Sequence, residues 1–98
     1  MTYRVDFSRV EYLFRNAKKL PGEIADGLQS WAEQVEKLGL PEVRKVKRYR
    51  DHQLKGQRHG ERSISLSYQW RAIYTESRNG ELTIIRIEEV TPHDYRKK

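Results

Sequence analysis

The clearest pattern in the chain is a run of apolar side chains at helical spacing over residues 21–38. Five of them step by four, three, four and three residues: Ile24, Leu28, Trp31, Val35 and Leu38. This spacing puts all five on one face of an α-helix. Pro21 can open the helix, and Gly39 followed by Pro41 can end it. We therefore expect a helix over 21–38 whose apolar face is buried.

The residues before this helix predict a short strand and another helix. Apolar and polar side chains alternate over residues 2–7, as in a half-buried strand. Residues 8–11 read Ser-Arg-Val-Glu, a capping box in which the serine and the glutamate bond to free N–H groups of the first turn. Apolar residues then follow at helical spacing. We expect a strand over 2–7 and a helix over 8–18 that forms a hairpin with the second helix.

The second half of the chain alternates with period two. Residues 63–67 read Ser-Ile-Ser-Leu-Ser, so the two apolar side chains face one way and the serines the other. A second apolar run follows at 70–76, and the Arg-Asn-Gly triplet at 78–80 is typical of a hairpin turn. Strict alternation fails over 82–90, where we expect an interior strand with a bulge near Glu88.

Together these elements predict an α+β fold in a single domain spanning residues 1–98. The expected strands cover residues 2–7, 61–67, 70–76 and 82–90. An N-terminal helical hairpin would pack on a twisted, mostly antiparallel sheet of four to five strands. The helix face around Trp31 should be buried against five side chains of the sheet, namely Ile64, Leu66, Ile73, Ile84 and Ile87.

Charge adds a basic region to this picture. The chain has 20 Lys and Arg against 14 Asp and Glu, a net charge of +6. Eight of these bases and only three acids fall within residues 42–62, a local balance of +5. The first part of this region, 42–50, favours a short turn or a ragged helix over a strand. A basic surface of this kind suits nucleic acid or an acidic protein partner.

Several classes of protein fit the composition poorly. The chain has no cysteine, which rules out disulfides and thiolate metal sites and is typical of a reducing compartment. No apolar stretch approaches the roughly 20 residues of a membrane helix, and the N-terminus lacks the apolar segment of a signal peptide. Three histidines without clustered carboxylates form no usual metal site. We expect a cytoplasmic protein without a metal or another cofactor.

A polar cluster precedes the strand pattern and supplies candidate chemistry. His52, Lys55, Arg58 and His59 lie within eight residues, just before the strand expected at 61–67. If that strand pairs with 70–76 as a hairpin, Arg71 lies on the sheet near the cluster. Cationic and titratable groups gathered on a rigid sheet suit an RNA phosphodiester as substrate.

These residues resemble a known family. The segment HQLKGQRHGERSISL followed by QWRAIY resembles the RelE/ParE superfamily of bacterial toxins, and its HigB-like branch most of all. The ending EEVTPHDY is similar to the tail of RelE-type members. The resemblance implies an mRNA interferase that enters the ribosomal A site and cuts the messenger there. It also implies neutralisation by an antitoxin protein encoded beside the toxin.

Metal-free cleavage of RNA needs a base for the 2′-hydroxyl, positive charge for the transition state and an acid for the departing 5′-oxygen. Arg71 can bind two phosphate oxygens and matches the phosphate-binding arginine of the family. His52 is the candidate base and Lys55 a candidate for charge stabilisation. The resemblance assigns His93 and Tyr95 to the catalytic tail. His59 is expected to lie on a turn without a catalytic role.

The basic region should form the footprint for RNA. Seven of its side chains are expected to bind RNA: Arg44, Lys45, Lys47, Arg48, Arg50, Arg58 and Arg62. The sequence departs from RelE-type members at Ser63 and Ser65, where those members often carry lysines, so the acid and the base stay open. Two alternatives also stay open, a ParE-like gyrase inhibitor and a catalytically silent RNA- or ribosome-binding module. A nuclease requires Arg71, Lys55, His52 and the tail to converge in one concave patch.

Overall fold

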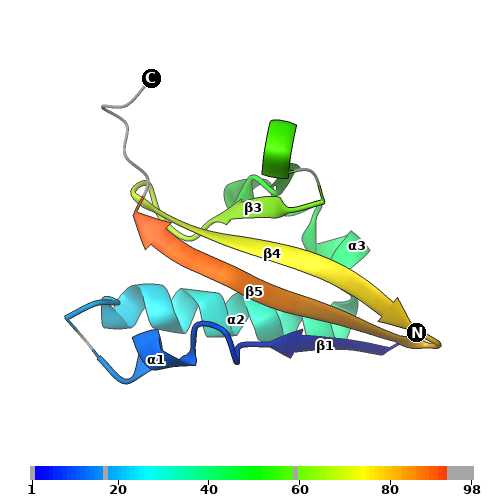
Figure 1. Cartoon of the computed structure of the whole chain (residues 1–98), viewed down its shortest axis with the longest axis horizontal. Coiled ribbons are helices and arrows are strands. Elements are labelled where there is room, and N and C mark those ends of the chain that lie inside the picture. The colour runs from blue at the N-terminus through cyan, green and yellow to red at the C-terminus, as the bar shows by residue number, and fades with distance from the viewer. Residues whose placement is uncertain (1, 17, 59, 93–98) are drawn as a thin grey trace.

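The computed structural model describes residues 2–16, 18–58 and 60–92 (Figure 1). The helical elements are α1 (Glu11–Phe14), α2 (Gly22–Leu38), α3 (Leu40–Val43) and the 3₁₀ turns η1 (Lys47–Tyr49) and η2 (Gly56–Arg58). The strands are β1 (Thr2–Asp6), β2 (His52–Gln53), β3 (Arg62–Ser65), β4 (Trp70–Asn79) and β5 (Leu82–Pro92). None of the helices within these ranges has the length and apolar composition needed to cross a membrane.

The five strands form one sheet in the order β1-β5-β4-β3-β2. Strand β1 runs parallel to β5, and the other three pairings are antiparallel. The predicted α+β fold with a mostly antiparallel sheet is thereby confirmed. The fifth strand is β2, which has two residues and brings His52 to the edge of the sheet.

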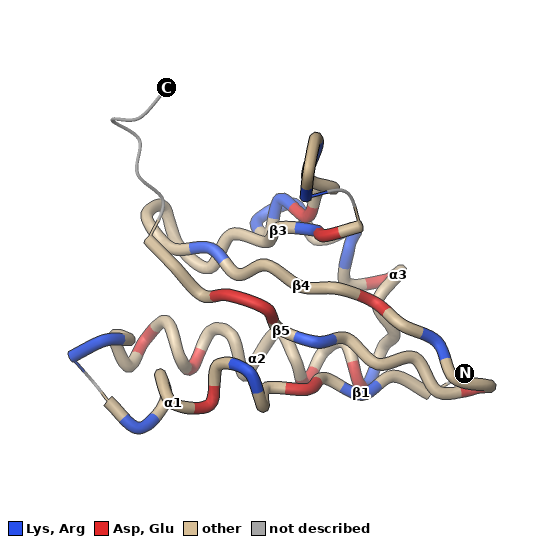
Figure 2. Tube along the Cα trace, in the orientation of Figure 1, with Lys and Arg blue, Asp and Glu red and all other residues tan. Residues whose placement is uncertain are grey.

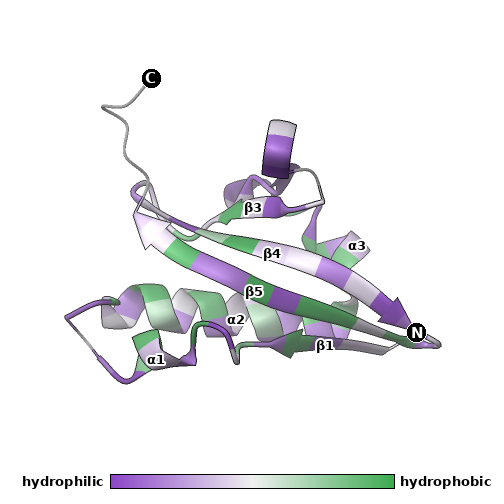
Figure 3. Ribbon diagram, in the orientation of Figure 1, coloured by the Kyte–Doolittle hydropathy of each residue, from purple (hydrophilic) through white to green (hydrophobic). Residues whose placement is uncertain are grey.

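Helix α2 packs along one face of the sheet, and its apolar side faces the strands (Figures 1 and 3). The predicted stripe is buried at Ile24, Leu28, Trp31 and Val35, whereas Leu38 is exposed. The ring centroids of Trp31 and Tyr74 lie 5.3 Å apart. The core therefore lies between α2 and this face of the sheet, which we call the inner face.

Of the helix predicted over residues 8–18, only the single turn α1 (Glu11–Phe14) forms. The Ser8 N–H donates to the Asp6 carboxylate at 2.9 Å, and α1 keeps only one helical turn. The bond from the Ser8 backbone also holds the pKa of Asp6 below its ordinary value. Because Ser8 bonds backward to Asp6, the expected capping box does not form, and Val10 takes the N-cap position without a side-chain bond.

The end of α2 follows the prediction only in part. Gly39 ends the helix with a φ of 89°, and a Cβ there would lie 3.3 Å from the Tyr3 ring. Pro41, however, does not stop helical structure, because α3 begins at once and tolerates proline in its first turn. The following residues form turns and η1, as expected for the 42–50 region.

The bulge predicted near Glu88 is confirmed. Ile73 pairs with Glu89 and Tyr74 pairs with Ile87, so Glu88 has no partner in the ladder. The bulge and the alternation place Ile85 and Ile87 in the core, while Ile84 is half-buried on the outer face. Ile73 is fully buried but lies outside the core cluster. The expectation that Ile73 and Ile84 pack on the helix is therefore wrong, whereas Ile64 and, in part, Leu66 do so.

Candidate functional site

Strand pairing lines up the polar residues of interest on the outer face of the sheet, away from α2. One row crosses β2, β3, β4 and β5 at His52, Ser63, Ile73 and Glu89. The next row crosses β3, β4 and β5 at Ser65, Arg71 and Thr91. The intervening residues Ile64 and Ala72 belong to the core, so alternation turns both rows outward.

These two rows border a cavity of about 240 Å³. Its lining combines three basic side chains with hydroxyls and aromatic rings: Arg50, His52, Ser63, Ser65, Ser67, Tyr68, Trp70 and Arg71. No carboxylate of the described residues lines it. A cavity with these groups is suited to an anion with an attached hydrogen-bonding or stacking portion.

Arg71 is the most unusual side chain of this cavity. It is half-buried, and its Nε is buried without a hydrogen-bond partner among the described residues. No Asp or Glu among the described residues forms an ion pair with Arg71. Burying a guanidinium donor without an acceptor is unfavourable, which makes this cavity a candidate for binding an acceptor from outside.

His52 enters the cavity from β2 with a defined orientation. Its Nδ1 lies 2.8 Å from the carbonyl oxygen of Arg50. A carbonyl oxygen can only accept, so Nδ1 carries the proton in this contact. In the neutral ring Nε2 then holds the lone pair and can accept a proton from a substrate.

Asp51, between Arg50 and His52, fixes this segment from the opposite side. Its side chain is 1% exposed and accepts hydrogen bonds from Tyr74 Oη at 2.5 Å and Arg62 Nε at 2.6 Å. Burial and the bond to Asp51 raise the pKa of Tyr74. The two neighbours of Asp51, Arg50 and His52, both line the cavity.

The other expected catalytic residues are not all brought to this cavity. Lys55 lines a separate cavity of about 320 Å³ with Gln53, Leu54 and Gly56. His93 and Tyr95 lie outside the described residues, as does His59. Strand β5 nevertheless leads the chain to the cavity, because its last residue, Pro92, pairs with Trp70.

Several cations expected to bind RNA are engaged with carboxylates. Arg62 pairs with Asp51, Arg58 with both Glu61 and Glu89, and Arg44 with Glu76, while Lys45 pairs with Glu42. The bonds to Glu61 and Glu89 raise the pKa of Arg58. Figure 2 shows Lys and Arg positions around β3 and the segment before it, with an acidic stretch within β5.

The three remaining cations lie in and after η1. Lys47 is exposed, and Arg50 borders the cavity. The Arg48 guanidinium lies 5.0 Å from the centroid of the Tyr49 ring.

Sequence reasoning missed Ser67, Tyr68 and Trp70 as cavity residues. Their position at the turn between β3 and β4 was the available signal, because such a turn borders the row that holds Arg71.

No protein-family model and no curated protein matches the chain. Solved structures match its fold. A YoeB/ParE toxin from Agrobacterium tumefaciens has a TM-score of 0.66 at 13% identity, covering 96% of this chain and 100% of that one. A chain of the E. coli DinJ-YafQ toxin-antitoxin complex has a TM-score of 0.67 at 20% identity, covering 95% and 94%. The YoeB dimer from Staphylococcus aureus has 0.67 at 15%, covering 96% and 100%.

These identities are low and the coverage is nearly complete, so the similarity is one of fold over the whole described architecture. The chain has the α+β fold of the RelE-like toxins, with a mixed five-stranded sheet and a few helices. The fold alone does not assign chemistry. The groups that could carry chemistry are those of the cavity around Arg71.

Proposed function

We propose that this chain is the toxin of a type II toxin–antitoxin pair and cuts mRNA on the ribosome as a metal-independent endoribonuclease. One observation carries the proposal. Arg71 is half-buried in a cavity that no carboxylate of the described residues lines, and its Nε lacks an acceptor among the same residues. The fold shared with YoeB, YafQ and RelE-type toxins supports the same assignment.

The proposed reaction is attack of the 2′-hydroxyl on the adjacent phosphorus. His52 Nε2 takes the proton of that hydroxyl, and the oxygen forms a bond to phosphorus as the bond to the 5′-oxygen breaks. The products are a 2′,3′-cyclic phosphate and a 5′-hydroxyl. Arg71 donates to the non-bridging oxygens, whose charge increases in the transition state.

The departing 5′-oxygen needs a proton, for which we propose the tail. His93 directly follows Pro92, the residue that pairs with Trp70 at the cavity. We assign His93 as the acid and Tyr95 to stacking or proton donation. Lys55 lies two residues beyond the Gln53 end of β2, and we assign it to a neighbouring phosphate because it lines a different cavity.

The proposed partners are mRNA in the ribosomal A site and a neighbour-encoded antitoxin. Fold relatives were solved as the DinJ-YafQ and YoeB-YefM complexes. An antitoxin with acidic segments would complement the basic cavity, and such charge complementarity speeds association. Association of the two proteins should therefore slow as salt concentration rises.

The test is expression in cells of the wild type, Arg71→Ala and a matched control, with mRNA 5′ ends mapped. Arg4→Ala is the control. Arg4 is exposed on the edge strand β1, and its substitution removes the same charge as Arg71→Ala does. We expect wild type and Arg4→Ala to stop growth and to create new ends inside coding sequences. Arg71→Ala should do neither.

New mRNA ends that persist at the wild-type level in Arg71→Ala would overturn the nuclease assignment of the cavity. Growth arrest without new mRNA ends would favour the two alternatives. Damage at gyrase sites on DNA would then indicate a ParE-like inhibitor, and stalled but intact messages would indicate a silent ribosome-binding module.

A further inference from the structure

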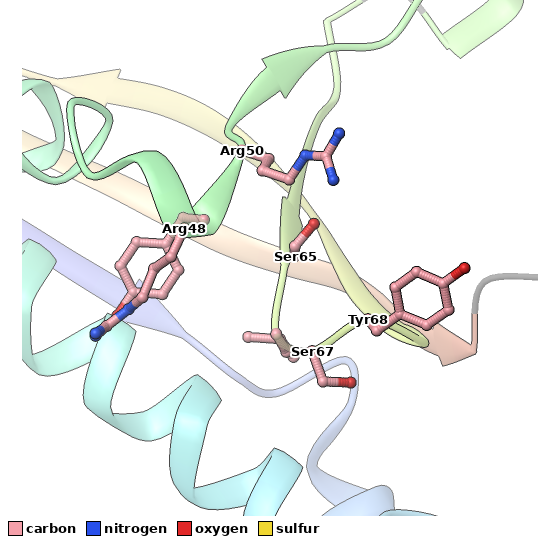
Figure 4. Close-up of a pocket in the computed structure, with 7 residues that line it drawn as sticks. Arg48, Arg50, Ser65, Ser67 and Tyr68 are labelled. Carbon is pink, nitrogen blue, oxygen red and sulfur yellow. The ribbon is translucent and has the colours of Figure 1, made fainter.

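A second cavity of about 320 Å³ adjoins the one that holds Arg71 (Figure 4). Its lining is Arg48, Tyr49, Arg50, Ser65, Leu66, Ser67 and Tyr68. Four of these residues, Arg50, Ser65, Ser67 and Tyr68, also line the Arg71 cavity. The two hollows therefore form one continuous surface, and a chain bound at Arg71 can extend along it.

Tyr68 presents an aromatic ring at the border of both hollows. It is 77% exposed, although a tyrosine ring is largely apolar and gains from burial. The turn that carries it is held in place, since Leu66 N–H donates to Trp70 O at 2.8 Å and Trp70 N–H donates to Ser67 Oγ at 3.2 Å. The backbone that positions the ring is thus fixed before any ligand binds.

Arg50 supplies positive charge at the same border. Its side chain is exposed and has no carboxylate partner among the described residues. Its backbone adopts a left-handed conformation with φ of 49° and is held by the His52 contact to its carbonyl oxygen. In Figure 4, Arg50, Ser65 and Tyr68 extend to the same side of β3.

Arg48 differs from Arg50 although both line the second cavity. Its Nη2 donates to the Tyr49 hydroxyl at 3.3 Å, and that hydroxyl also accepts from Gln34 Nε2 of α2 at 2.9 Å. In Figure 4 it extends away from Arg50 and Tyr68. The recognition chemistry of the second cavity is therefore one exposed aromatic ring, one available guanidinium and serine hydroxyls.

We propose that this second cavity binds the nucleotide next to the scissile phosphate, with its base stacked on Tyr68 and its phosphate bound by Arg50. Aromatic rings stack on any base and guanidinium groups bind phosphate, so this pair of groups fits single-stranded RNA. The proposal rests on the proposed nuclease function. Tyr68 would hold the messenger in register over Arg71 without taking part in proton transfer.

The test is single-turnover cleavage of a defined mRNA on purified ribosomes, followed over a range of protein concentrations. Tyr68→Ala should raise the half-saturating concentration about 10-fold, the size expected for one lost stacking contact. Tyr68→Phe keeps the ring and should stay within about threefold of wild type. Tyr12→Ala is the matched control, since Tyr12 is also exposed but lies on α1.

The decisive arm uses messages in which one nucleotide flanking the cleaved bond has no base. If Tyr68 stacks on that base, wild type and Tyr68→Ala should cleave the abasic message with the same half-saturating concentration. If Tyr68→Ala raises the half-saturating concentration on every abasic message as much as on the intact message, the stacking role is overturned, because the ring would then act elsewhere. Wild-type behaviour of Tyr68→Ala on the intact message would overturn it as well.

Failure of the subsite and failure of the proposed function give different results. If wild type cleaves, Arg71→Ala does not and Tyr68→Ala matches wild type, only the subsite is wrong. If wild type leaves the message intact, or if Arg71→Ala cleaves as wild type does, the nuclease proposal itself fails and the subsite with it.

Discussion

Arg44 and Arg62, on the inner side of the sheet, and Arg71, on its outer face, differ in their carboxylate partners. On the inner face, Arg62 bonds to the buried carboxylate of Asp51 and Arg44 bonds to Glu76. On the outer face, Arg71 lies in a cavity whose described lining residues include no acidic side chain. Arg44 and Arg62 belong to the basic region 42–62 and Arg71 follows it closely, so the number of bases in this part of the sequence says little about function. The position of the carboxylates decides which arginine holds the fold and which is available to a ligand.

Arg58 shows that the face alone is not decisive. It is tied to β5 on the outer side through Glu89 and to its own loop through Glu61. Two carboxylates already satisfy its guanidinium, so a phosphate would have to displace them. We therefore place Arg58 with the structural arginines, together with Arg44 and Arg62.

The largest expected loss of stability comes from removing the Asp51 carboxylate, which accepts hydrogen bonds on the inner face of the sheet. Asp51→Ala leaves Arg62 and the buried Tyr74 hydroxyl without their acceptor. Breaking a buried ion pair in this way should lower the free energy of unfolding by about 3–5 kcal/mol. Denaturant titration measures this free energy. A loss below about 1 kcal/mol would show that the hydrogen bonds of Asp51 do not hold the segment around His52.

A smaller effect is expected at Glu88, on the outer face away from the cavity. Its side chain is 8% exposed, and burial alone would favour the neutral acid. Hydrogen bonds from Thr75 and Arg86, with the charges of Arg86 and Arg9, outweigh burial and hold the pKa of Glu88 below its ordinary value. Glu88→Gln should therefore lower the free energy of unfolding at pH 7 by about 1–2 kcal/mol.

The pH dependence of this difference follows from the lowered pKa. The stabilisation is complete above the unfolded-state value of about 4.3 and is lost as pH falls through the lower folded-state value. The gap between wild type and Glu88→Gln, measured by denaturant titration at several pH values, should close on acidification. A gap that stays constant into strong acid would contradict the role given to the charge.

The smallest effect is expected where an ion pair is open to solvent. Lys45 and Glu42 pair at 3.0 Å with side chains that are 72% and 59% exposed. Glu42→Ala should change the free energy of unfolding by no more than about 0.5 kcal/mol. A loss comparable to that of Asp51→Ala would mean that burial does not separate structural from incidental pairs in this protein.

The sheet and α2 could be predicted because their signals are periodic and repeated. Trp31 lies in a stripe of five apolar positions, and the failed alternation around Glu88 located the bulge. The segment after β1 could not be predicted in the same way. There the Ser8 N–H bonds to Asp6 and not to Glu11 as in a capping box, so the expected helix does not start at residue 8.

The candidate site was predicted only where strand pairing determines it. Pairing of β3 with β4 places Arg71 opposite Ser65, so this residue could be located from the pattern alone. Some carboxylate partners of the other arginines come from far along the chain, as Glu76 does for Arg44 and Glu89 does for Arg58. No local pattern reveals such contacts, and none indicated that Lys55 lines a cavity of its own.

We propose that Arg71 is positioned to bind a phosphate and does not stabilise the fold. The most direct test is the single-turnover rate of mRNA cleavage on purified ribosomes for Arg71→Ala, with its free energy of unfolding measured alongside. We expect a rate at least about 100-fold lower, equivalent to roughly 3–4 kcal/mol of lost transition-state stabilisation. The free energy of unfolding should change by less than about 1 kcal/mol, because no carboxylate in the described ranges loses a partner. An unchanged rate, or a loss of stability like that of Asp51→Ala, would contradict the claim.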